Sequence, residues 1–352
     1  MRKDFVSADT LRAVSTDLLL IGAGPIGIEL AVRLKQAGIA YTHIDAGQIG
    51  STIAWYAPQT HFFSSPERIA IAGVPLQTLD QTKATREEYL TYLRAVVLQF
   101  DLPIETYQRV TSLVRRDDGA FDVTTRGRDG ARVRVAGKVV LAIGDMHRPR
   151  LLGVPGEDLP HVSHYFGDPH LYFRRRVLIV GGRNSAVEAA IRCVRVGAEV
   201  TLSYRGEDLD DPHIKFWLLP ELRALVRDGR MTFLPHTTIR EIRSDAVILD
   251  PGEQRLDPDF VLLLTGYEQD TTLLEDAGVT LTGPARKPQF DERTMETNVP
   301  NLYIAGTAAA GTQASSTKEF IETCHVHVDR IVAALTGANA PATPAAYELP
   351  ES

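Results

Sequence analysis

Two stretches of this chain share one pattern, which limits the folds open to it more than any other feature. Residues 16–47 (TDLLLIGAGPIGIELAVRLKQAGIAYTHIDAG) and 176–206 (RVLIVGGRNSAVEAAIRCVRVGAEVTLSYRG) each read as an apolar strand, a glycine-rich turn, an amphipathic helix and a second apolar strand. A continuous apolar strand is typical of a parallel sheet covered on both faces. The two copies therefore predict an α/β fold with two nucleotide-binding units.

The rest of the sequence predicts that one domain is inserted into the sequence of the other. Residues 86–99 read as a helix, and a later helix is expected over about 316–335, after a strand that enters another glycine turn. We expect a discontinuous first domain, residues 1–152 and 286–352, with the second domain, residues 157–285, inserted into it.

Composition narrows the classes of function. The 352 residues carry a net charge of −7, with no basic excess for nucleic acid. No apolar run approaches the length of a membrane span, so we expect a cytoplasmic protein without a membrane partner. The two cysteines, Cys193 and Cys324, are too far apart in sequence for a local dithiol or zinc motif, and no metal site is predicted.

The first glycine turn fits the pattern G-x-G-x-x-G. In such a turn Gly22 permits the tight bend, Gly24 lets a pyrophosphate approach the backbone, and Gly27 allows the helix to pack on the strand. Asp45 ends the next strand, where a carboxylate accepts hydrogen bonds from ribose hydroxyls and repels a 2′-phosphate. The turn therefore predicts FAD or NAD rather than NADP.

The second turn departs from this pattern because Arg183 stands where the middle glycine is usual. The following strand ends in Tyr204 and Arg205 instead of an acid. A basic residue there can pair with the 2′-phosphate of NADPH, and Tyr204 could stack on adenine. Lys215 is a weaker phosphate candidate. NADPH is preferred over NADH, and the alternative is a degenerate unit that binds nothing.

Further motifs complete a resemblance to a known family. VVLAIG (139–144) is similar to the turn that precedes the crossover in two-dinucleotide flavoproteins, and NLYIAGT (301–307) to their carboxy-terminal FAD motif. In this order the motifs resemble the thioredoxin-reductase-like class of FAD/NADPH flavoproteins. Residues 60–65, 181–185, 204–206, 214–221 and 320–322 resemble the bacillithiol disulfide reductase family within that class.

The resemblance implies two Rossmann-like domains and NADPH-dependent reduction, through FAD, of a small disulfide or another small acceptor. It also implies a homodimer. The residues expected at FAD are Gly22, Gly24, Pro25, Ile26, Gly27, Asp45, Ala46, Thr60, Val110, Ala142, Gly144, Gly306 and Thr307. Those expected at NADPH are Gly182, Arg183, Asn184, Ser185, Tyr204, Arg205, Lys215 and Gly266.

One departure from the family concerns the substrate. The family usually carries a cysteine in the first turn, where this chain has Ile26, and an apolar side chain cannot form a mixed disulfide. Cys193 is expected in the core, whereas Cys324, on the last helix, is a weak redox candidate. Thr307 also stands where the wider class has an aspartate that holds the ribityl chain.

The acceptor is expected near five residues: Ile53, Trp55, Tyr56, Thr60 and His61. His61 is the candidate proton donor of this group, although a lone histidine is more often structural.

The last helix holds two more histidines, His325 and His327, whose roles stay open.

Three alternatives remain open. A thioredoxin-reductase-like ferredoxin–NADP reductase would explain the missing thiols. A flavin monooxygenase would share both dinucleotide folds, and residues 160–166 weakly resemble that family's fingerprint. A non-enzymatic flavoprotein is the third, but two intact nucleotide sites favour hydride transfer.

Overall fold

The computed structural model describes residues 14–209, 214–312 and 319–339. The chain forms two compact units, one of residues 1–54, 61–147 and 269–352, the other of residues 55–60 and 148–268. The longer segment of the second unit, residues 148–268, begins and ends earlier in the sequence than the inserted domain that we expected at residues 157–285. Among the described residues, no helix is both long and apolar enough to cross a bilayer.

The first unit is built on a mixed sheet with the strand order β3-β2-β1-β6-β5-β4. Parallel pairing joins β3, β2, β1 and β6, and β19 adds to β6 in parallel. The strands are β1 (Val14–Ile21), β2 (Thr42–Ile44), β3 (Ile104–Glu105), β4 (Arg109–Arg115), β5 (Phe121–Gly127), β6 (Gly130–Leu141) and β19 (Leu302–Ile304). The antiparallel part of the sheet consists of β4, β5 and β6.

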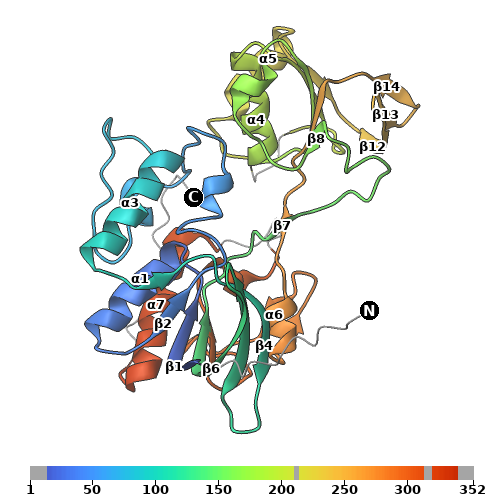
Figure 1. Ribbon diagram of the computed structural model, residues 1–352. Helices are drawn as coiled ribbons and strands as arrows, with labels where there is room; N and C mark the ends of the chain where they lie inside the picture. The colour runs from blue at the N-terminus through green and yellow to red at the C-terminus, as the bar shows by residue number, and fades with distance from the viewer. Residues whose placement is uncertain (1–13, 210–213, 313–318, 340–352) are drawn as a thin grey trace, which may run out of the picture. The chain divides into compact units, whose positions relative to one another are not determined.

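Three main helices belong to this unit: α1 (Pro25–Gln36), α3 (Arg86–Gln99) and α7 (Ile321–Thr336). In Figure 1, α1 and α7 lie side by side, and the two helices make direct contact. The bounds of α3 match the expected helix, and Thr85 and Glu88 form a reciprocal capping box at its start. The shorter elements are α2 (Pro66–Ile69), α6 (Thr272–Asp276), β17 (Leu281–Thr282), β18 (Lys287–Pro288) and η3 (Gly306–Ala310). One short element, η1 (Ile53–Trp55), contains residues of both units.

The second unit contains a fully parallel sheet in the order β11-β10-β9-β15-β8. Helix α4 (Asn184–Arg195) packs on it through an apolar face that includes the fully buried Cys193. The other elements are β7 (Arg148–Pro149), β8 (Val162–Ser163), η2 (Pro169–Tyr172), β9 (Arg176–Val180), β10 (Glu199–Ser203), α5 (Leu219–Arg227), β11 (Thr232–Leu234), β12 (Thr238–Ile242), β13 (Val247–Asp250), β14 (Gln254–Leu256), β15 (Phe260–Leu263) and β16 (Tyr267–Glu268).

Candidate functional site

The three glycines of the first turn are present for different physical reasons. A methyl group on Gly22 would lie 2.3 Å from the carbonyl oxygen of Ala142, and one on Gly27 would lie 1.9 Å from that of Gly22. Gly24 is different, because its backbone is extended and a methyl group there would meet nothing within 4 Å. Packing within the protein thus requires glycine at the first and third positions, whereas the middle glycine leaves space for a bound ligand.

Two buried side chains form hydrogen bonds with the backbone of this turn. Asp45 accepts hydrogen bonds from the backbone N–H of Ala23 at 2.6 Å and of Gly47 at 2.7 Å. Its carboxylate therefore orients the turn and still has lone pairs for a ribose hydroxyl. His43 was not predicted, and its Nε2 donates to the carbonyl oxygen of Gly22 at 2.9 Å. Burial lowers the pKa of His43 to about 4, so the ring is neutral.

Segments distant in sequence meet at the same turn. The side chain of Ile26 packs against Gly306, where an added methyl group would lie 3.5 Å from Ile26 Cβ. A methyl group on Gly144 would lie 3.8 Å from Thr307 Oγ1. The first turn, the end of β6 and the carboxy-terminal motif thus surround one open backbone position, an arrangement that fits the diphosphate and ribityl part of FAD.

The second unit repeats the turn with altered residues. A methyl group on Gly181 would lie 2.5 Å from the carbonyl oxygen of Leu264, so this glycine matches Gly22. The ring of Tyr204 covers Gly182, where a methyl group would lie 2.1 Å from the ring. Arg183 occupies the position of Gly24 with an extended backbone and an exposed side chain. The turn therefore accommodates an arginine without backbone strain.

Basic residues gather around the start of α4. Asn184 opens this helix, and its Oδ1 accepts from the backbone N–H of Lys215 at 2.8 Å. Arg183 precedes Asn184, and Arg205 is exposed just after β10. A helix N-terminus flanked by cations favours a phosphate-bearing ligand. Gly266 lies two residues after Leu264, whose carbonyl oxygen faces Gly181, and its own carbonyl oxygen accepts from Arg150 N–H at 2.9 Å.

The predicted acceptor residues are divided between the two units. Ile53 and His61 belong to the first unit, and Trp55, Tyr56 and Thr60 to the second. His61 is exposed and forms a β-bridge with Thr85.

Thr60 is held by a side chain that the sequence did not single out. Its Oγ1 accepts from Arg192 Nη1 at 2.9 Å. Val110 lies on β4, and Ala46 is exposed beside Asp45.

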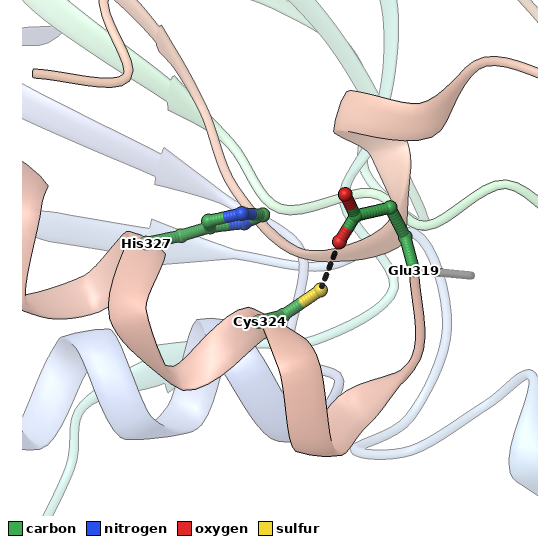
Figure 2. Close-up of side chains that lie close together, drawn as sticks. All are labelled: Glu319, Cys324 and His327. Atoms are coloured by element: carbon green, nitrogen blue, oxygen red, sulfur yellow. Dashed lines mark hydrogen bonds between the residues drawn. The ribbon is translucent and has the colours of Figure 1, made fainter. Parts of the chain in front are cut away.

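Three side chains at the start of α7 lie close together, and two of them, Cys324 and His327, are buried. Figure 2 shows Cys324 and His327 on this helix and Glu319 just before it, with the Cys324 thiol donating to the Glu319 carboxylate at 3.8 Å. Burial and the nearby Glu319 charge raise the pKa of the Cys324 thiol, so it stays protonated. The raised pKa argues against a nucleophilic role.

The same cluster has the residue types of a metal site, with ligand atoms within 4.8 Å of one another. His327 Nδ1, however, accepts from the backbone N–H of Gly306 at 3.2 Å. In the neutral ring the proton then sits on Nε2, which leaves no free imidazole lone pair for an ion. The cluster instead anchors the carboxy-terminal motif to α7.

We expect acid to destabilise the first unit through two of its buried histidines, His43 and His327. The pKa values of His43 and His327 are both lowered to about 4, mainly by burial. The unfolded chain takes up these protons near pH 6.5, so stability falls as the pH drops from about 6.5 to about 4, by roughly 3 kcal/mol per histidine.

Urea unfolding at several pH values measures this loss. His43→Gln keeps an N–H donor for Gly22 without a titrating group and should flatten part of the pH dependence, whereas His61→Gln, an exposed control, should not. Equal slopes in the three proteins would contradict the assignment.

Comparison with known proteins agrees with this geometry. The profile of the family described as pyridine nucleotide-disulphide oxidoreductase matches residues 19–306. The chain is 37% identical to the bacilliredoxin reductase Bdr of Bacillus subtilis (strain 168) over 318 residues, which are 90% of this chain and 96% of that protein. It is 28% identical to a ferredoxin–NADP reductase of Ignicoccus hospitalis, over 82% of this chain and 89% of that protein.

A solved structure is also similar to this chain over most of its length. The bacillithiol disulfide reductase Bdr from Bacillus cereus superposes with a TM-score of 0.86 at 36% identity, covering 92% of this chain and 99% of the other.

Proposed function

Because the chain belongs to the pyridine nucleotide-disulphide oxidoreductase family and is an FAD- and NADPH-dependent flavoprotein oxidoreductase, we propose that it reduces a small disulfide of the bacillithiol type. The observation that carries this proposal is the likeness to the bacillithiol disulfide reductase of Bacillus cereus, at 36% identity and a TM-score of 0.86 with 92% of this chain covered. The two glycine turns support it, since one offers an open backbone position and the other a cationic helix start.

The chain's own residues orient the two cofactors, and the flavin supplies hydride chemistry when bound. In the first unit, Gly24 would admit the diphosphate, Asp45 would receive the ribose, and Gly306 and Thr307 would lie at the ribityl chain. In the second unit, Arg183 and Lys215 would contact the NADPH diphosphate, and Arg205 would pair with its 2′-phosphate.

The acceptor step needs no protein thiol in this proposal. Ile26 fills the place of the family's turn cysteine and is buried against Gly306. The two cysteines of the chain are buried and unpaired, and burial raises the pKa of Cys193 to about 12. We propose that electrons pass from the flavin to the acceptor without a mixed disulfide on the enzyme.

An acceptor panel with NADPH tests this proposal. Bacillithiol disulfide, an oxidised bacilliredoxin, other small disulfides, ferredoxin, quinones and oxygen are supplied in turn to the purified holoenzyme. We expect a disulfide to give the highest kcat/KM, and Cys193→Ser and Cys324→Ser to retain it. Loss of turnover in Cys324→Ser with full FAD content would contradict the thiol-free route, and Ile26→Cys shows whether a turn thiol adds to the rate.

Ferredoxin–NADP reductase activity is the second candidate. Ile26 favours it, because transfer to an iron–sulfur protein needs no thiol in the turn, and the Ignicoccus hospitalis relative covers 82% of the chain. Turnover with ferredoxin but with no disulfide would establish this function instead. Peroxide release that rises with a nucleophilic substrate would favour a monooxygenase.

We further propose a cytoplasmic homodimer. Unpaired cysteines and a disulfide-reducing activity suit a reducing compartment, and the dimer follows from the family resemblance. Light scattering during size-exclusion chromatography distinguishes a dimer from a monomer.

A further inference from the structure

Helices α1 and α7 are joined by a partly buried ion pair between residues 296 positions apart. Glu29 on α1 and His325 on α7 meet through Oε2 and Nδ1 at 2.7 Å. The other ring nitrogen, Nε2, lies 3.0 Å from the carbonyl oxygen of Arg68. The other carboxylate oxygen accepts from Ala72 N–H at 3.1 Å. We call this pair the Glu29–His325 clasp.

The partners of the clasp determine how many protons His325 carries. A carboxylate and a carbonyl oxygen only accept hydrogen bonds, so both ring nitrogens must donate, and only the imidazolium has two N–H groups. Burial alone would lower the pKa of His325, but the bonds to Glu29 and Arg68 outweigh it and the pKa is raised.

Other titratable groups around the clasp come from α3 and α7, and Tyr92 of α3 is close enough to Glu29 for the carboxylate charge to act on its phenol. Glu322, on α7, adds a negative charge near His325 and accepts from Ser64 Oγ at 2.5 Å. One turn further along, Arg33 of α1 pairs with Asp329 of α7 at 3.0 Å in a more exposed position.

Each of the two helices is connected to one half of the candidate FAD site. These halves are the first glycine turn, for α1, and the carboxy-terminal motif with Gly306, for α7. Helix α1 starts inside the first glycine turn, and Glu29 lies on its first turns. Helix α7 holds the carboxy-terminal motif, since His327 accepts from Gly306 N–H. The alignment of α1 with α7 therefore sets how the first turn meets Gly306.

We propose that the Glu29–His325 clasp is a positioning device for FAD, which holds the two halves of the site together only while His325 carries both ring protons. The proposal rests on the FAD site but not on any electron acceptor, so it can fail while the proposed disulfide reduction stands. Without FAD the two halves share no ligand, and a weakened clasp lets α1 shift relative to α7. FAD binding must then restore the alignment.

The direction of the pH effect follows from linkage. A histidine whose pKa is raised in the folded protein contributes fully below about pH 6.5 and loses its contribution as the pH rises through the folded value. FAD affinity should therefore fall as the pH rises, by about tenfold between pH 6 and pH 8.5, the size of one charge-assisted hydrogen bond. By reciprocity, FAD should raise the pKa of His325 further.

The experiment measures the Kd of the apoprotein for FAD by fluorescence across this pH range. The decisive variant is Glu29→Gln. Its amide oxygen accepts from Ala72 N–H and its NH2 donates to Nδ1 of a neutral His325, which keeps its other N–H for Arg68. Its FAD affinity should not change with pH, whereas a purely structural role of Glu29 predicts the wild-type slope with weaker binding at every pH.

The matched control is Arg33→Ala, which removes the exposed pair between the same helices and should keep the wild-type slope. Imidazole NMR of wild-type protein should show a pKa of His325 above the ordinary histidine value, and a still higher pKa in the presence of FAD. A wild-type Kd that does not change with pH, or a Glu29→Gln slope equal to the wild-type one, would overturn the proposal.

Discussion

Gly24→Ala should fold normally and lose FAD. No described atom lies within 4 Å of a methyl group at this position and its backbone is extended, so the apoprotein should accept alanine. The methyl group would occupy the space through which a diphosphate approaches the backbone. We expect the Kd for FAD to rise about a hundredfold, equivalent to one or two charge-assisted hydrogen bonds. Fluorescence titration of apoprotein with FAD measures it.

Gly22→Ala provides the contrasting result. Gly22 has a φ of +110°, and its methyl group would lie 2.3 Å from the Ala142 carbonyl oxygen, so this variant should lose about 2 kcal/mol or more of folding stability. Unchanged FAD affinity in a well-folded Gly24→Ala protein would show that the open position is not the diphosphate site.

Arg205→Ala should remove the preference for NADPH over NADH. Arg205 is exposed after β10, where a guanidinium can pair with a 2′-phosphate but has no partner on NADH. We expect kcat/KM for NADPH to fall about fiftyfold and that for NADH to stay constant. Stopped-flow bleaching of the flavin band by each nucleotide gives the half-reaction without an acceptor.

Arg230→Ala is the matched control, because Arg230 is an exposed arginine of the same unit that follows α5. It should leave both nucleotides unaffected. A parallel loss with NADPH and NADH in Arg205→Ala would mean that this residue contacts the shared diphosphate instead.

The sequence predicted features that local patterns determine. The strand–turn–helix units follow from apolar runs and glycine spacing, and both ends of α3 were predicted from the pattern of residues 86–99. His43 was missed because its role depends on a neutral ring under Gly22, which no local pattern indicates. Glu29 and His325 were not linked, because only tertiary packing brings residues 296 positions apart into contact.

The short segment of residues 55–60 has a consequence for how this protein can be recombined with its relatives. The segment packs as part of the second unit, where Trp55 contacts Tyr165 and Arg192 binds the Pro58 carbonyl oxygen and Thr60 Oγ1. If only residues 148–268 of this protein were moved into a relative, Arg192 would face the relative's own version of the segment 55–60. Transplanting the nucleotide specificity of one homologue into another therefore requires moving two separate pieces of sequence together.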